Sequence, residues 1–254
     1  MKAAWIKSLA LAAVAVGYSH AIFGIGGQWA PAPGLEVKGS SGTVAGSGAN
    51  AISINQGKVT GLNGFGVKLW VDALPFVDIE AGSNIQWGLY DVSISQGSDT
   101  TKLKFDLGVP TVNKPAFARI VSDVTVLYPF LKLPPLVPIS ILKVYAGAGI
   151  THVIATEILN EKLALKAVDK ATNSGADPSA ADTPEKVSKL LVQSIKDEGL
   201  KSGIGFHLEL GAKAKIPIIP IAVYTDIKYH FLSSMPSAVD ANSMTFELGG
   251  ALAF

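Results

Sequence analysis

Two histidines are the residues of this chain best suited to hold a metal ion. His207 and His230 fall in neighbouring segments of alternating polarity. A turn centred on Ile218 and Ile219 would place them opposite each other. Imidazole binds transition metals, but a metal site needs at least a third ligand. The pattern supplies two, so hydrogen-bonded interior histidines are favoured, and we expect no metal and no cofactor.

Nucleophilic catalysis has weaker support. Ser83 and Ser122 fall on the apolar side of their segments, and the sequence indicates no histidine beside them. A lipid-modifying acyl enzyme is therefore the least favoured alternative. The chain has no cysteine, which excludes a thiol nucleophile. Gly24, Gly26 and Gly27 precede no helix and do not indicate a phosphate loop. We expect a protein that is not an enzyme.

Charged residues recur at alternate positions, which gathers them on one face. With Lys215, this face carries six basic and seven acidic residues. Balanced charge suits a narrow, ion-paired interior, because an unpaired buried charge is costly. The predicted interior network comprises Lys68, Asp72, Asp78, Glu80, Arg119, Asp123, Lys143, Glu209, Lys213, Asp226, Lys228 and Glu247.

The opposite face of the same segments is apolar. From Ile221 to Phe231 every odd position is apolar, aromatic or Thr, whereas the even positions include Asp226 and Lys228. This is the period of a β-strand. The pattern predicts eight strands, at Phe23–Trp29, Phe65–Asp72, Val77–Tyr90, Arg119–Tyr128, Leu142–Thr151, Gly203–Lys215, Ile221–Phe231 and Met244–Phe254.

The N-terminus indicates export. Residues 1–21 contain Lys2 and Lys7 before an apolar run, and end with small residues up to Ala21, which predicts a signal peptide cleaved after Ala21. Residues 22–254 then form one domain with no further apolar run of transmembrane-helix length. A net charge of +1 gives no reason to expect a nucleic-acid partner.

Eight apolar faces without a large soluble core predict an all-β fold, a single antiparallel up-and-down barrel that spans a membrane. A soluble lipocalin-like barrel is the rival, but its apolar face would point inward. Phe76 and Trp87 are 11 residues apart, or roughly 28 Å along the membrane normal, which matches the two aromatic girdles of a membrane barrel. The predicted lipid-interface aromatics are Trp29, Phe76, Trp87, Tyr128, Tyr229 and Phe231.

Short and long connections alternate along the chain. The short ones, at 73–76, 129–138 and 216–220, contain proline, which ends strand pairing. We expect these and both termini on the periplasmic side, with the long connections outside. The long ones are 32–60, 91–115, 154–201 and 232–242, and the Ser- and Gly-rich stretch 39–48 is predicted to be flexible. Lys102–Gly108 also alternates, and with a partner near Ala51–Val59 it would make ten strands.

The connection 154–201 is the one predicted to be helical. Thr183 and Pro184 begin a helix that keeps its apolar residues on one face and ends at Gly199. An earlier segment, 156–170, is less regular, and 173–181 reads as a linker. Two facing amphipathic helices are expected, with docking to a membrane surface or partner as the alternative.

Turn centres also predict register. A turn at Ile218 and Ile219 places Glu209 opposite Lys228, and a turn at Leu74 places Lys68 opposite Glu80. A one-residue slip would move every side chain to the other face.

The export signal, the eight amphipathic strands, the strand Tyr224–Tyr229 and the final segment Thr245–Phe254 resemble the small outer-membrane β-barrels of Gram-negative bacteria, the class of outer-membrane proteins A, X and W. This resemblance implies an integral outer-membrane location among outer-membrane lipids. It also implies that Phe254 is the assembly signal read by the barrel-assembly machinery.

Two functions are compatible with this fold. The first is a structural or surface-interaction role, with ion pairs plugging the lumen and an extracellular ligand bound by the long loops. The second is a narrow channel for passive transport of small or hydrophobic solutes. For the channel, Trp70, Tyr90, Tyr145 and Tyr224 would line an apolar pocket near the outside.

Overall fold

The computed structural model describes residues 23–72, 76–103, 114–133, 142–173, 181–215, 219–233, 235–236 and 238–254. The predicted signal peptide lies outside the described residues. So do the centres of the three proline-containing turns and most of two further segments, Lys102–Gly108 and the linker 173–181.

Eight strands form one closed antiparallel barrel, as predicted. They pair in chain order, and the first strand pairs with both the second and the last, so the sheet closes on itself. The barrel strands are β1 (Phe23–Trp29), β5 (Val59–Val71), β6 (Asp78–Leu89), β9 (Ala116–Leu133), β10 (Leu142–Thr156), β11 (Leu200–Lys215), β12 (Ile221–Leu232) and β13 (Asn242–Ala253).

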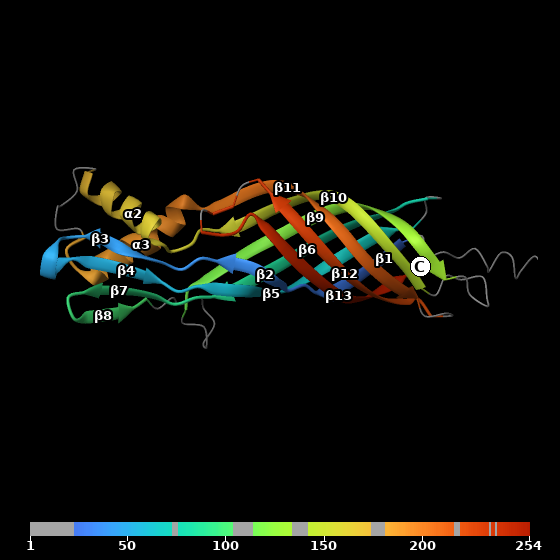
Figure 1. The fold of residues 1–254 in the computed structure, drawn as a ribbon, viewed down its shortest axis with the longest axis horizontal. Coiled ribbons are helices and arrows are strands. Elements are labelled where there is room, and N and C mark those ends of the chain that lie inside the picture. The colour runs from blue at the N-terminus through green and yellow to red at the C-terminus, as the bar shows by residue number, and fades with distance from the viewer. Residues whose placement is uncertain are drawn as a thin grey trace, which may run out of the picture.

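The end of the chain completes the closure. Phe254 N donates a hydrogen bond to Phe23 O at 2.9 Å, and Phe23 N donates to Phe254 O at 3.3 Å. The C-terminus and the strand ends that the short connections join lie at one end of the elongated molecule, and the described parts of the long connections extend from the other end (Figure 1). The predicted alternation of short and long connections is therefore confirmed.

Strand β9 is longer than the sequence indicates. A turn was predicted from Pro129, but the strand continues to Leu133. Pairing with β6 ends at Leu127, opposite Asp78, so no ladder bond on that side requires an N–H from Pro129. On the other side the register shifts between Val144 and Tyr145, which absorbs Phe130 as a bulge.

The long connections build a second sheet beyond the barrel. Strand β2 (Ala32–Val37) pairs with β5, and the sheet itself has the order β3-β4-β7-β8. Its strands are β3 (Ser40–Ala45), β4 (Ile52–Gln56), β7 (Val92–Gln96) and β8 (Asp99–Lys102), with a 3-10 turn, η1 (Gly48–Asn50), between the first two. The prediction of a flexible loop at 39–48 is therefore wrong, because β3 pairs with β4 there. The ten-strand alternative is also wrong, since β4 joins this sheet and not the barrel.

Two helices pack beside the second sheet, in the connection where they were predicted. Helix α2 (Glu161–Asn173) begins later than expected because β10 runs on to Thr156. Helix α3 (Pro184–Glu198) begins at the predicted cap, where Thr183 Oγ1 accepts from Lys186 N at 3.4 Å. None of the described helices is long and apolar enough to cross a membrane. We call strands β3, β4, β7 and β8 with helices α2 and α3 the projecting unit.

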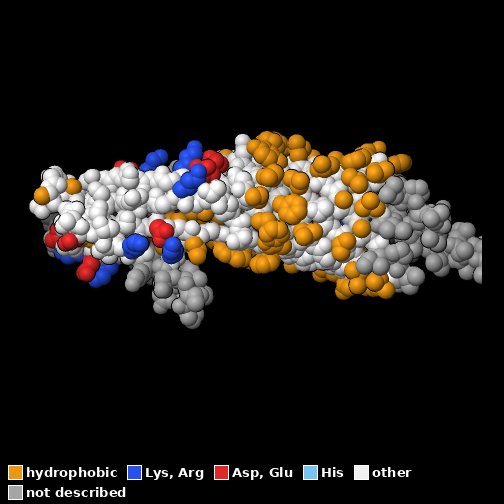
Figure 2. All heavy atoms as spheres, turned by 60° about the horizontal axis from the view of Figure 1, so that its bottom comes forward, with side chains coloured by type: hydrophobic (Ala, Val, Ile, Leu, Met, Phe, Trp, Pro, Cys, Tyr) orange, Lys and Arg blue, Asp and Glu red, His pale blue; other side chains and the backbone are white. Residues whose placement is uncertain are grey.

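The barrel is apolar outside and charged inside. In β11, Leu208 and Leu210 are 53% and 54% exposed, whereas Glu209 between them is 4% exposed. Figure 2 shows hydrophobic side chains spread over the face of the barrel in view, and charged side chains on the projecting unit and at its junction with the barrel. Such an exterior requires an apolar solvent, so the lipocalin-like alternative is excluded and the barrel spans a membrane.

Glycines make room for the crowded interior. A methyl group at Gly24 would overlap the indole of Trp70, and one at Gly211 would overlap Asp226 and Tyr145. Glycine recurs on the charged face of the strands because large side chains occupy the space next to it.

Candidate functional site

The barrel interior near the short connections holds a small balanced cluster. Lys143 Nζ lies 3.0 Å from Asp72 Oδ2 and 3.2 Å from Asp78 Oδ2. Lys213 Nζ lies 3.8 Å from Asp72 Oδ1 and 3.9 Å from the ring centroid of Trp70. Two cations therefore meet two carboxylates, and an aromatic face supplies the second contact of Lys213.

Further inside, Lys68 of β5 lies within salt-bridge distance of four carboxylates, the most distant being Glu209, with Oε1 4.0 Å away. Its Nζ lies 2.7 Å from Glu80 Oε1, 2.5 Å from Asp226 Oδ2 and 2.8 Å from Glu247 Oε2. All four side chains are fully removed from solvent. Asp226 also accepts from Tyr145 Oη at 2.5 Å. Charge-assisted hydrogen bonds of this kind offset the cost of burying the ions.

Lys228 of β12 is the second cation of this layer. Its Nζ lies 2.7 Å from Asp123 Oδ1, 3.3 Å from Glu80 Oε1, 3.5 Å from Glu247 Oε2 and 3.6 Å from Glu209 Oε2. Because Glu80 and Glu247 contact both lysines, the layer is one connected network across the barrel. We call Lys68, Lys228, Glu80, Asp123, Glu209, Asp226 and Glu247 the middle layer.

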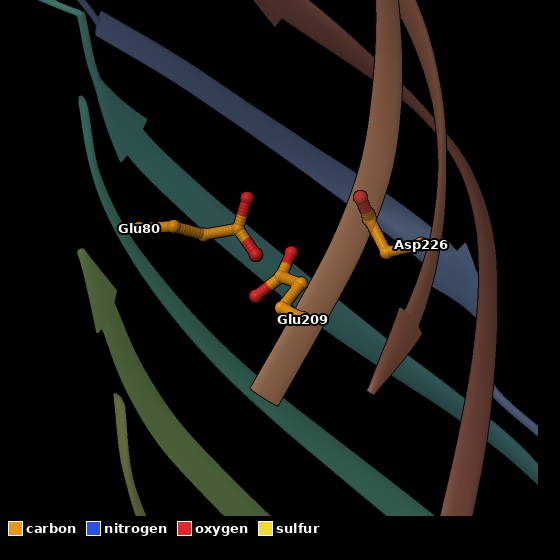
Figure 3. Close-up of side chains that lie close together, drawn as sticks. All are labelled: Glu80, Glu209 and Asp226. Atoms are coloured by element: carbon orange, nitrogen blue, oxygen red, sulfur yellow. The ribbon is translucent and has the colours of Figure 1, made fainter. Parts of the chain in front are cut away.

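The middle layer has the spacing of a metal site but contains its own cation. Ligand oxygens of Glu80, Glu209 and Asp226 lie within 4.8 Å of one another, and Figure 3 shows the Glu80 and Glu209 carboxylates facing each other with Asp226 beside them. That spacing would suit an oxygen-coordinated cation. However, Lys68 Nζ already lies 2.7 Å from Glu80 and 2.5 Å from Asp226. We therefore interpret the cluster as an ion-pair network.

The next layer is formed mainly by amides. Gln28 Nε2 donates to Asn84 Oδ1 at 2.6 Å, and Asn84 Nδ2 donates to Glu247 Oε1 at 2.7 Å. Arg119 Nε donates to Gln86 Oε1 at 2.7 Å. Among the described residues no carboxylate lies within salt-bridge distance of Arg119, so the structure separates it from the charged residues with which it was predicted to pair.

The two interior histidines lie beside each other, with ring centroids 5.6 Å apart, and His207 Nε2 is 3.9 Å from Glu209 Oε2 of the middle layer. They are opposite each other in register, as predicted. Thr151 Oγ1 lies 2.8 Å from His207 Nδ1 and 3.1 Å from His230 Nδ1, and Thr125 Oγ1 lies 2.8 Å from His207 Nε2. One threonine hydroxyl thus bridges the two rings, which is the hydrogen-bonded arrangement favoured from the sequence.

Toward the projecting unit the inward-facing side chains become apolar. Six buried residues fill the barrel there, and we call them the apolar plug: Leu62, Phe117, Val121, Val153, Ala155 and Leu232. One continuous core joins the plug to Leu163, Val187 and Leu191 of the helices and to Ile54 and Ile94 of the second sheet. The barrel and the projecting unit therefore share a hydrophobic core.

Tyr90 fastens this core to the barrel rim. Its hydroxyl accepts a hydrogen bond from Leu159 N at 3.1 Å. Burial raises the pKa of Tyr90 to about 12, so the phenol is neutral at physiological pH.

Five of the six predicted interface aromatics lie on the outer face of barrel strands, and the sixth, Phe76, is exposed just before β6. Phe76 and Tyr128 are beside the short connections, and Trp29, Trp87, Tyr229 and Phe231 are nearer the long ones. The rings of Trp87 and Phe65 pack in a tilted arrangement with centroids 6.0 Å apart, and Phe231 stacks with Phe206 at 4.5 Å.

Two predicted arrangements are wrong. Lys68 lies opposite Gly82 and not Glu80, because β5 and β6 pair with Val71 opposite Ile79, two residues away from the predicted register. The long lysine side chain still reaches Glu80 diagonally. The aromatic pocket near the outside does not form. Trp70 and Tyr224 pack together at the end of the barrel where the strands joined by short connections terminate. Tyr90 belongs to the core at the opposite end of the barrel.

Sequence reasoning missed two features. The apolar plug could have been recognised from Phe117, Val121 and Val153, which are apolar at inward positions of their strands. A pair on the outer wall, Ser202 and His152, was hidden because 50 residues separate them. His152 is also the register partner of Ser122, beside which no histidine was identified.

No protein-family model matches this chain, and no curated protein matches its sequence. Several solved structures are similar in fold. They include the outer membrane protein OprG from Pseudomonas aeruginosa, 12% identical over 91% of this chain and 95% of that chain, with a TM-score of 0.49. Neisserial surface protein A is 10% identical over 91% and 97%, with a TM-score of 0.45. Ail, the attachment invasion locus protein of Yersinia pestis, is 9% identical over 91% and 96%, with a TM-score of 0.40. At these values the fold assignment rests on the strand pairing of this chain itself.

Proposed function

We propose that this protein is an integral outer-membrane barrel with a structural and surface-interaction role. The observation that carries this proposal is the shared core of the plug and the projecting unit. The core of a second structural unit fills the outer end of this barrel. Such a barrel is better suited to hold the projecting unit in a fixed position at the membrane surface than to conduct solutes.

The ion-paired interior supports the same role. Eight strands enclose just enough space for side chains. Lys68 and Lys228 fill the middle of that space with contacts to five carboxylates. A permeating ion would have to displace these contacts and then cross the plug, which offers no polar group of its own side chains. The transport alternative therefore has less support.

The projecting unit is the candidate binding surface. Exposed charges such as the pairs Lys58–Glu36 and Lys170–Asp197 surround its base and helices. We propose that an extracellular ligand binds here, that outer-membrane lipids surround the apolar band, and that Phe254 is read by the barrel-assembly machinery.

Single-channel recording in planar bilayers tests the sealed interior. The wild-type protein should give no steady current steps, and Lys228→Gln should not create them while the plug is intact. A control variant on the projecting unit, Lys170→Gln, should also give no steady current steps. Steady steps whose size changes with Lys228→Gln but not with Lys170→Gln would favour the channel.

Binding by liposomes tests the surface role. Proteoliposomes that carry the full chain should bind target cells, and a variant with residues 157–199 replaced by a short turn should lose that binding while keeping heat-modifiable gel migration. Equal binding by both would contradict a role for the helices.

A further inference from the structure

A serine and a histidine meet on the outer wall of the barrel. Ser202 of β11 and His152 of β10 are both exposed, and Ser202 Oγ lies 2.8 Å from His152 Nε2. In this arrangement an imidazole can take the serine proton and activate the oxygen as a nucleophile. Ser122 lies opposite His152 in register, but its hydroxyl pairs with Ser83 at 3.0 Å. The geometry therefore singles out Ser202.

The surroundings of this pair are suited to acyl chains. Ile150, Leu200 and Ile204 project from the same two strands and are 68%, 66% and 61% exposed. Ile150 and Ile204 are nearer the apolar band than Ser202 and face the lipid, whereas Leu200 lies on the far side of Ser202.

The pair lies beyond the aromatic girdle on the side of the projecting unit. Phe206, which stacks with Phe231, is four residues further along β11 than Ser202. At about 3.3 Å per residue and a tilt near 40°, Ser202 is roughly 10 Å beyond the girdle. That position is outside the apolar band, at the outer edge of the headgroup region, where water is available.

A cavity of about 340 Å³ adjoins Ser202. Three lysines line it, Lys162, Lys166 and Lys201, together with the carboxylates Glu157 and Glu198. Lys166 and Lys201 both pair with Glu198, and Lys201 Nζ also lies 3.6 Å from Glu157 Oε2. Three lysines against two carboxylates leave the lining with one excess positive charge, which favours an anionic group such as a phosphate.

We propose that Ser202 and His152 hydrolyse a carboxylic ester of a phosphate-bearing lipid in the leaflet next to the projecting unit. Ser202 Oγ attacks the ester carbonyl while its proton passes to His152 Nε2. The C–O bond to the lipid alcohol then breaks, and the alcohol leaves with that proton. Water attacks the acyl-serine and gives a proton to His152, which returns it to Ser202 as the fatty acid leaves. The lysines of the cavity hold the phosphate.

Release of fatty acid from phosphatidylglycerol tests this activity. The full chain, folded in mixed micelles of detergent and phosphatidylglycerol, should release fatty acid that mass spectrometry detects, and a fluorophosphonate probe should label the Ser202 peptide. Ser202→Ala and His152→Ala should each lower the release rate by at least about 100-fold.

Ser122→Ala is the matched control, because it changes the other serine beside His152. It should retain the wild-type rate, and heat-modifiable migration should show that all variants are folded. A wild-type rate no higher than that of Ser202→Ala, or a probe attached to a different serine, would overturn the proposal.

Discussion

Glu209 of β11 lies directly opposite Lys228 of β12, with Glu209 Oε2 3.6 Å from Lys228 Nζ inside the barrel. Both belong to a layer in which five carboxylates surround two ammonium groups, a formal excess of three negative charges. The two partners should therefore respond differently to mutation, although they form one ion pair.

Loss of the cation should be costly. Lys228→Met leaves the carboxylates of Asp123 and Glu209 without their closest cation, and should lower the free energy of unfolding by about 3–5 kcal/mol. Glu209→Gln removes one of the excess negative charges and should cost less than about 1 kcal/mol. Urea titration followed by gel migration of the folded barrel measures both. Equal losses for the two variants would show that charge excess does not govern this layer.

Two glycines of β1 should differ in their tolerance of alanine. Gly24→Ala drives a methyl into the Trp70 ring and should destabilise the barrel by about 1–3 kcal/mol. Gly27 is exposed, and a methyl there would meet its nearest neighbour, Gly66 O, only at 4.0 Å. Gly27→Ala should therefore be nearly neutral in the same titration, and a larger loss at Gly27 than at Gly24 would contradict the packed interior.

Substitution by arginine should reduce stability more on the lipid-facing wall of the barrel than on the projecting unit. Leu208→Arg places a charge in the apolar band and should cost about 2–4 kcal/mol. Leu165 of α2 is also partly exposed, at 37%, but lies on the projecting unit. Leu165→Arg should change stability by about 0.5 kcal/mol or less. Comparable losses at both positions would place Leu208 outside the membrane.

Ionisation of Tyr90 should make the stability of the protein depend on pH at high pH. Its pKa in the folded protein is raised to about 12 from the ordinary 10, so its contribution to stability is complete below pH 10 and is lost as the pH rises toward 12. Tyr90→Phe leaves Leu159 N without its acceptor and should loosen the junction by about 1–3 kcal/mol. Hydrogen exchange at residues 157–163 measures this loosening. Exchange that is unchanged in Tyr90→Phe would show that the hydroxyl is dispensable.

The barrel could be predicted from the sequence because lipid and lumen impose opposite polarities on alternate residues. Leu208, Glu209 and Leu210 display this directly. Register was also predictable where the turn centre was evident, as for Glu209 and Lys228. The register prediction failed at Lys68. An error of one residue in the predicted turn centre changes the residue opposite Lys68 by two positions, from Glu80 to Gly82, but each side chain stays on the predicted face of the sheet.

The projecting unit was only partly predictable. Helix α3 has a local start and stop, Thr183 and Gly199, so its ends could be found. Strand β3 consists of Ser, Gly, Thr, Val and Ala, and is a strand only because β4 pairs with it. The contact between Ser202 and His152 likewise depends on the pairing of β10 with β11, which alternation alone does not specify.

The sealed outer end of the barrel can be tested most directly by cysteine accessibility, since the chain has no cysteine of its own. Val153→Cys would stand in the apolar plug, and Asn50→Cys on the exposed η1 turn is the control. In the folded protein a water-soluble maleimide should label Asn50→Cys rapidly and leave Val153→Cys unlabelled until the barrel is unfolded. Labelling of Val153→Cys at a rate close to that of Asn50→Cys would show that water fills the mouth of the barrel, and would contradict the proposed seal.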